Sequence, residues 1–556
     1  MPSARKTLLT AAAGLALADA SVVTLALPQL LPELDATVEG VAAVIGVYTV
    51  VLALALLPAE TLRRRIGARR LGAGALGLFA LACIGCAAAG SLELLLALRA
   101  VQALGGAAAL IAAFDLLGAG DPKGEGRRLW STAAVVGFAA GPALGGVLTQ
   151  LFDWRAIFVV QVPVALLGAA ACAPWSLREA TRGGGAPRGR DSRRTNGFRR
   201  GPAVALALLS AALTAVLFLL VLMLVAGWNE EPLAAAAAVS VLPLAALATR
   251  GAGGDPRLRA AAGCVLVAAG TLSLAFLPLA SLWWTLVPQA LAGAGMGLAL
   301  PALAGDLLPE RDPAEAARLL VARHAGIALA LLLLAPVVAS RLDSATELAK
   351  ERGIAIVLDS PLPPQEKLKL APALLVGVDQ AEPRRGLQRA IERRRSGYPG
   401  GQRAEYDRLA KRADDTLVEA VAESFRLAFA LAAALALAGA LAVLPAAARR
   451  RALARVAAVA AVVPVAYALL HATLAPEPVK IADPCSERRQ PSASGIPGML
   501  QGAALGTLDQ IACHFGSSRE QLVLALADVG EARAYKRRYG VDPRSAGNLL
   551  QGLIGP

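Results

Sequence analysis

Residues 8–30 read LLTAAAGLALADASVVTLALPQL, an almost unbroken apolar run with one charged residue, Asp19, in its middle. An α-helix rises 1.5 Å per residue, so about 20 apolar residues cross the hydrocarbon core of a bilayer. The run is too long for the apolar region of a signal peptide, and we interpret it as a retained membrane helix. Residues 202–227 form a second run of this kind.

The composition of the whole chain is that of a polytopic membrane protein. Of its 556 residues 56% are hydrophobic and only 17% are charged, whereas a soluble chain of this length divides into several domains with more charged surface. Ala, Gly and Leu dominate the apolar runs, and small residues let membrane helices pack closely. The net charge of +14 does not indicate nucleic-acid binding, because the arginines lie between the apolar runs and not on one amphipathic face.

The apolar runs predict an all-α protein with thirteen membrane helices. They lie near residues 8–30, 39–58, 70–90, 92–117, 129–150, 156–176, 202–227, 233–249, 259–279, 283–305, 318–340, 424–446 and 454–474. The arginines and lysines of the short loops gather on one side of this arrangement, which the positive-inside rule makes the cytoplasmic side. We therefore expect a multi-pass protein of a bacterial inner membrane, with its N-terminus in the cytoplasm and its C-terminus outside.

This topology divides the chain into five parts. A six-helix bundle at 1–176 and a basic cytoplasmic linker at 177–201 precede a second six-helix bundle at 202–446, which contains a long outer insertion at 341–423. An additional membrane helix at 447–474 leads to an extracytoplasmic helical domain at 475–556 that offers a surface for a protein partner. There the stretch GTLDQIACHFGSSREQLVLALAD at 506–528 predicts two helices joined by a turn, the second capped by Ser517 or Ser518.

The cysteines fall into two groups. Cys485 and Cys513 lie in the outer tail, where an oxidising compartment allows a disulfide, although two free thiols are equally compatible with the spacing. Cys83, Cys86, Cys172 and Cys264 lie in apolar runs, and we interpret them as small packing residues.

Two charged residues at membrane depth are candidates for function, since such charges are costly to bury. Helical rise places Asp19 about 19 Å from the cytoplasmic surface and Arg99 about 12 Å from the outer surface of a core about 30 Å thick, hence at nearly the same depth. One interpretation is a permanent ion pair that locks two helices. The other is a carboxylate tuned by Arg99 and by burial, able to exchange a proton or a cation.

Four motifs in the first half add a resemblance to a known family. They are LADASVVTLALP at 17–28, LALRAVQALGGAAA around Arg99 and Gln102, GFAAGPALGG at 137–146, and FDWRAIFVVQVPV at 152–164. Their order and positions resemble the drug:proton antiporter branch (EmrB/QacA type) of the major facilitator superfamily. The resemblance implies two six-helix bundles around a central cavity, with substrate sites near the midplane and alternating access.

The resemblance also assigns roles to residues. It implies a proton-coupling and substrate cavity near Asp19, Ser21, Thr24, Arg99 and Gln102. The fifth-helix motif implies a gate, formed by Gly137, Gly141, Pro142, Gly145 and Gly146. The loop ETLRRRIGARR at 60–70 departs from the family's pattern, because Glu60 and Arg64 stand where a Gly and an Asp are expected. Its inner-gate role therefore rests on Arg63, Arg64, Arg65 and Gly67.

These features predict a secondary transporter, and proton-coupled export of lipophilic or drug-like molecules in particular, without a metal or an organic cofactor. The alternative is a transport-inactive relative that acts as a receptor or envelope scaffold through its outer segments. An enzyme in the tail is disfavoured, because Cys513 and His514 lack an orienting third group. No nucleotide-binding loop of the G-x-x-x-x-G-K-[ST] kind is present, which disfavours ATP-driven transport.

Overall fold

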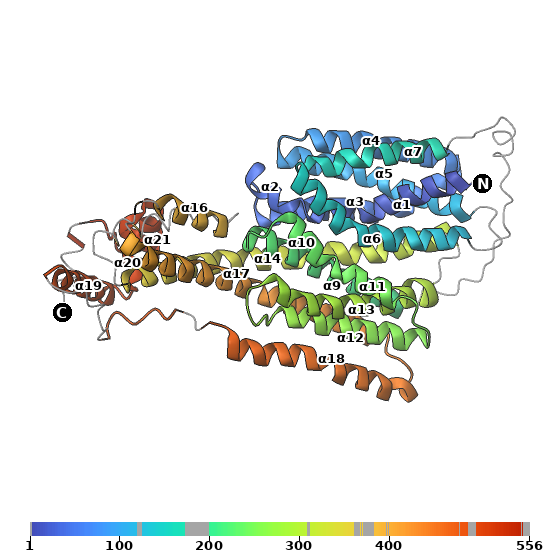
Figure 1. Ribbon diagram of the computed structural model, residues 1–556. Helices are drawn as coiled ribbons and strands as arrows, with labels where there is room; N and C mark the ends of the chain where they lie inside the picture. The colour runs from blue at the N-terminus through green and yellow to red at the C-terminus, as the bar shows by residue number, and fades with distance from the viewer. Residues whose placement is uncertain are drawn as a thin grey trace. The chain divides into compact units, whose positions relative to one another are not determined.

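A computed structural model of the protein consists of helices joined by short connections, with no strand among the residues that it describes (Figure 1). These are 3–118, 125–172, 200–308, 312–360, 367, 370, 383–395, 397, 400–476, 479–486, 496–545 and 547–548. The expected basic linker at 177–201 lies outside them except for its last two residues.

Within its described residues, the first half contains seven helices in place of the six expected. They are α1 (Ser3–Thr24), α2 (Leu27–Glu33), α3 (Val38–Ile66), α4 (Ala68–Ala88), α5 (Leu92–Gly118), α6 (Glu125–Leu151) and α7 (Arg155–Cys172). The extra helix arises because the expected span at 8–30 is interrupted after Thr24. Pro28, in the first turn of α2, has no N–H to donate to the Thr24 carbonyl, so α1 cannot continue through it.

The second half has similar interruptions. It contains α9 (Arg200–Val221), the π-helical segment η1 (Leu222–Gly227), α10 (Pro232–Val239), α11 (Val241–Thr249), α12 (Pro256–Leu274), the 3₁₀ turn η2 (Leu282–Thr285), α13 (Leu286–Pro301) and the π-helical segment η3 (Ala302–Leu307). The expected single helix at 233–249 divides at Ser240, because Pro243 cannot donate to the Val239 carbonyl. Pi-helical turns are rare and occur mostly at functional sites.

Three further helices complete the membrane part: α14 (Pro313–Leu358), α17 (Gly400–Ala442) and α18 (Ala447–Leu474). The apolar runs placed the end of one span near 340 and the start of the next near 424, but α14 and α17 continue well beyond those limits. Their polar extensions are rich in Ala, Glu, Lys, Leu and Arg, residues with high helix propensity, so the helices persist after the apolar pattern ends.

Among the described residues, eleven helical segments are long and apolar enough to cross a membrane. The other two expected spans coincide with α1 and α6, in which some positions are outside the description. The all-helical membrane fold expected from the sequence is confirmed.

The chain forms two compact units. The membrane unit comprises 1–225, 230–339 and 425–474. The second unit, which we call the outer unit after the location expected from the sequence, comprises 226–229, 340–424 and 475–556. Four candidate spans separate 229 from 340, and two separate 424 from 475. An even number of crossings returns the chain to the same face, which explains how three distant segments join in one unit. The insertion and the tail, expected as separate parts, thus fold together.

The outer unit contains α16 (Pro383–Arg395), α19 (Ile496–His514), α20 (Arg519–Ala527) and α21 (Val529–Tyr539), together with the ends of α14 and α17. A capping box of Ser518 and Gln521 starts α20, as the sequence predicts. Ile511, Leu522 and Tyr535 form the centre of a small apolar core. The buried Arg519 joins the tail to the insertion through an ion pair of 2.8 Å with Asp359.

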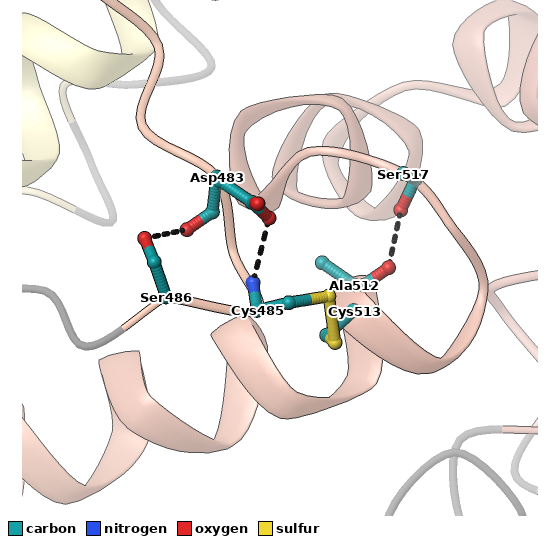
Figure 2. Close-up of a disulfide and its surroundings, with 6 residues drawn as sticks. All are labelled: Asp483, Cys485, Ser486, Ala512, Cys513 and Ser517. Carbon is teal, nitrogen blue, oxygen red and sulfur yellow. Dashed lines mark hydrogen bonds between the residues drawn. A yellow bond between two sulfur atoms is a disulfide. The ribbon is translucent and has the colours of Figure 1, made fainter.

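Cys485 and Cys513 form a disulfide in this unit, with Cα atoms 5.0 Å apart (Figure 2). Cys485 lies in a short turn in which Asp483 Oδ1 accepts a hydrogen bond from the Cys485 amide at 2.9 Å. Cys513 is one residue before the end of α19. The bridge therefore holds the chain that leaves α18 against the end of α19, close in sequence to the capping residue of α20.

Removing this disulfide with the double variant C485S/C513S is expected to destabilise the outer unit by roughly 3 kcal/mol. The reason is that the bond closes a loop across a sequence separation of 28, and loops of this size confer about that much. Limited proteolysis of the full-length protein checks this through the rate at which the tail is cut. Dithiothreitol must accelerate cleavage of the wild type and leave the double variant unchanged. A wild type indifferent to the reductant would contradict the prediction.

Candidate ion-coupling site

The centre of the candidate site is a buried ion pair between α1 and α5. Arg99 Nη1 lies 2.7 Å from Asp19 Oδ2, and both side chains are fully buried. The expectation that these two residues share one depth agrees with this contact. Because a buried charge without a partner costs several kcal/mol, each of the two groups depends on the other.

Two glutamine side chains complete the surroundings of the carboxylate. Gln102, one turn after Arg99 on α5, and Gln161 on α7 each donate from Nε2 to Asp19 Oδ1 at 3.2 Å. Gln102 Oε1 in turn accepts a hydrogen bond of 2.6 Å from Arg99 Nη1. Asp19, Arg99, Gln102 and Gln161, which we call the coupling cluster, therefore join three helices through one carboxylate.

Arg99 is also held from the side of α3. Its Nε donates to the Val44 carbonyl at 3.1 Å, and its guanidinium carbon lies 4.3 Å from the centre of the Tyr48 ring. Tyr48 itself donates to the Ala16 carbonyl of α1 at 3.2 Å. The buried Nη2 of Arg99 has no hydrogen-bond partner among the described residues. The guanidinium thus has a fixed position, and Nη2 is its one nitrogen without a hydrogen-bond partner among the described residues.

The sequence analysis missed Gln161 and Tyr48, and gave Cys83 only a packing role. Gln161 lies in the quoted FDWRAIFVVQVPV stretch, where an amide at membrane depth is itself a signal for function. Cys83 accepts a hydrogen bond of 3.2 Å from Gln102 Nε2, so it borders the cluster. No such signal marks Tyr48, since a single tyrosine in an apolar run is compatible with simple packing.

Ser21 and Thr24 lie on α1, two and five residues after Asp19. Both are buried. Ser21 donates to the Ala18 carbonyl at 2.7 Å and faces α6, where its side chain touches the position a Cβ of Gly141 would take. Their proposed place in the substrate cavity stays a prediction.

The glycines of the fifth membrane helix bring α6 against two other helices. A Cβ added to any of three of these glycines would overlap α1: at Gly137 it would meet Gly14, at Gly141 it would meet Ser21, and at Gly145 it would meet Val22. Gly146 is closed in the same way by Ala236 and by the Pro232 carbonyl, at 3.0 Å, of α10. Pro142 lies buried inside the helix. The motif therefore joins the helix that carries Asp19 to the second half of the protein.

The last turns of α3, where the sequence predicted a loop at 60–70, form an ionic cluster with α5. Arg63 contacts Glu60 at 2.6 Å and Asp115 at 2.8 Å, and Arg64 contacts Glu60 at 2.9 Å. Gly67 has a φ of 85° at the turn into α4, whereas Arg65 is exposed. Asp115 lies 16 residues after Arg99 on α5, hence about 24 Å along that helix. The helix α5 thus carries the coupling arginine and an ion pair at its far end.

At the other end of the bundle, the start of α7 is joined to α2. Trp154 Nε1 donates to Glu33 Oε2 at 2.8 Å, and Arg155 forms an ion pair of 3.0 Å with the same carboxylate. Phe158, one turn after Trp154, lies with its ring centre 5.7 Å from the Arg99 guanidinium carbon. The last of the four motifs therefore connects the end of α2 to the surroundings of Arg99.

A bundle of membrane helices that buries an ionisable carboxylate between an arginine and two amides is an arrangement typical of membrane transport proteins. Residues 9–339 match the model of the Major Facilitator Superfamily, and the chain belongs to this family.

The relatives of this chain include drug-resistance proteins. It is 29% identical over 153 residues to the multidrug resistance protein Stp of Mycobacterium tuberculosis, covering 27% of this chain and 28% of Stp. It is 31% identical over 156 residues to the methylenomycin A resistance protein of Streptomyces coelicolor, covering 27% and 33%. The tetracenomycin C resistance and export protein of Streptomyces glaucescens is 30% identical over 165 residues, covering 29% and 31%. The matched region thus spans about a third of each relative or less.

The fold is also found in a solved structure. A bacterial homologue of the human lysosomal transporter Spinster, in an inward-facing and occupied conformation, aligns with a TM-score of 0.51 and 13% identity. The alignment covers 79% of this chain and 95% of the homologue. The likeness confirms the major facilitator fold expected from the motifs.

Proposed function

We propose that the protein exports lipophilic or drug-like small molecules in exchange for protons, by alternating access. The observation that carries this proposal is the coupling cluster, because it places one ionisable carboxylate at the contact of α1, α5 and α7. The resistance proteins among its relatives support small-molecule export. The apolar composition of the spans supports a lipophilic substrate over a sugar or a nucleotide.

The contacts of Asp19 suggest how a proton is coupled to movement. In the charged state the carboxylate holds Arg99, Gln102 and Gln161 together. Protonation removes the charge opposite Arg99, whose guanidinium is then a buried cation with only the Val44 carbonyl, Gln102 and the Tyr48 ring around it. That arrangement is unfavourable, so proton binding favours a different arrangement of α1 against α5. A ligand shifts a conformational equilibrium only through such a difference between states.

The orientation in the membrane is part of this proposal. We place the N-terminus in the cytoplasm and the outer unit outside, because the arginine-rich short loops define the cytoplasmic face. The Cys485–Cys513 disulfide supports this orientation, since disulfides persist in oxidising compartments. A bacterial inner membrane is the location that fits the bacterial relatives.

Proton release from energised inverted membrane vesicles tests the proposal. A panel of lipophilic cations is added to vesicles with an imposed pH gradient, and collapse of the gradient is the signal. The wild type is expected to give a substrate-dependent collapse that the Asp19→Asn variant lacks, because an amide keeps the shape of the side chain but carries no proton across the cycle.

Asp306→Asn is the matched control, since Asp306 pairs with Arg259 in the second half and lies outside the coupling cluster. It is expected to keep the signal. Normal collapse in Asp19→Asn would reject Asp19 as the proton site. No collapse with any compound, in correctly inserted wild type, would instead favour a transport-inactive scaffold that acts through its outer segments.

A further inference from the structure

The outer unit contains a strongly cationic helix, α16, with the sequence PRRGLQRAIERRR. Six arginines stand against one glutamate. Leu387 and Ala390 are buried, Tyr406 of α17 donates to the Ile391 carbonyl at 2.7 Å, and Arg384 forms a two-pronged ion pair with Asp414 of α17. The apolar side of α16 is therefore occupied within the outer unit, and its cationic side is left outward.

The exposed arginines follow one line along the helix. Arg385, Arg389 and Arg393 are exposed and four residues apart, so they lie on one face over a length of about 12 Å. Arg394, also exposed, extends the surface at the end of the helix. We call these four residues the arginine face.

The start of α16 is hydrogen-bonded to residues that directly follow a candidate membrane span. Arg384 donates to the Trp228 carbonyl. Arg385 Nε donates to Asn229 Oδ1 at 3.0 Å, and Asn229 Nδ2 donates to Gln388 Oε1 at 3.1 Å. Trp228 and Asn229 directly follow Gly227, the last residue of a candidate span. The first two turns of α16 are therefore held to Trp228 and Asn229, the two residues that follow this candidate span in the sequence.

We propose that the arginine face binds the headgroups of anionic phospholipids at the surface of the membrane. A guanidinium binds phosphate oxygens through two parallel hydrogen bonds, and clustered basic residues next to a span attract anionic lipids. Because the apolar side of α16 is buried in the protein, the contact is made with headgroups and not by insertion of the helix. Such binding is screened by salt.

Photolabelling of the full-length protein in bilayers tests this directly. The probe is phosphatidylglycerol with a photoactivatable headgroup, present as a minor component in phosphatidylcholine. Labelled sites are mapped after digestion with a protease that does not cut at arginine. Labelling within 383–412 is expected to fall about tenfold in R389Q/R393Q/R394Q, and to be competed by unlabelled phosphatidylglycerol but not by phosphatidylcholine. Arg385 is kept because it also bonds Asn229.

Two controls separate this effect from loss of charge or of fold. The variant R533Q/K536Q/R537Q removes three exposed cations from α21 of the same unit, and it must label like the wild type. Labelling near Arg450 and Arg451, which begin α18, must stay constant in all three proteins. Equal labelling of α16 in the wild type and R389Q/R393Q/R394Q would overturn the proposal. The proposal would also be overturned if the arginine face bound a soluble acidic peptide and showed no lipid labelling. That result would indicate a protein partner. Because photolabelling does not depend on transport, it tests lipid binding independently of the proposed export.

Discussion

Arg99→Met is expected to destabilise the protein by about 3–5 kcal/mol, because it leaves the Asp19 carboxylate buried without its cation. The variant Asp19→Asn/Arg99→Met should recover part of that loss, since removing both charges of a buried pair costs less than removing one. Thermal unfolding of the single and double variants in one detergent measures the coupling energy as a double-mutant cycle.

Arg155→Met is the matched control for this cycle. Arg155 is also an arginine of the first half paired with a carboxylate, Glu33, but the side chains are 36% and 43% exposed. An exposed pair contributes roughly 0–1 kcal/mol, so this variant should unfold close to the wild type. A double variant no more stable than Arg99→Met would show that the two charges do not depend on each other.

Gly141→Ala is expected to reduce transport tenfold or more. A Cβ at this position lies 2.8 Å from the Ser21 Cβ and on top of the Ser21 hydroxyl, so α6 and α1 must separate or shift. Crowding of this kind typically costs about 1–3 kcal/mol. In a protein that alternates between two conformations, this cost destabilises the conformation in which α6 and α1 are in contact. The vesicle assay measures the loss.

Gly77→Ala provides the comparison, because a Cβ on this α4 residue meets nothing within 4 Å. Alanine favours a helix over glycine by about 1 kcal/mol, so that substitution should be neutral or stabilising. The double variant Ser21→Gly/Gly141→Ala should restore activity, because removing the Ser21 side chain makes room for the new methyl group. Failure of this pair would indicate that the Ser21 hydroxyl is needed for itself.

Much of the membrane part follows from local composition. Runs such as 92–117 and 454–474 predict the spans because hydropathy depends only on neighbours in the sequence, and the helices α5 and α18 lie there. The breaks at Pro28 and Pro243 were missed, since a proline inside an apolar run is tolerated in some membrane helices and ends others. The difference depends on whether nearby groups satisfy the freed carbonyl.

The candidate site was predictable only in part. Asp19, Arg99 and Gln102 stand out as polar residues at membrane depth. Arg99 and Gln102 are also one helical turn apart on α5. Gln161 comes to Asp19 from 142 residues away, and no local pattern encodes that distance. The same holds for the outer unit, in which Arg519 and Asp359 are 160 residues apart.

The separation of Arg519 from Asp359 has a consequence for synthesis. Residues 340–424 are made before the tail, and two candidate membrane spans lie between them and residues 475–556. The insertion therefore cannot complete its fold, and Asp359 cannot pair with Arg519, until the tail has been synthesised. The outer unit therefore closes only after residues 475–556 have been synthesised.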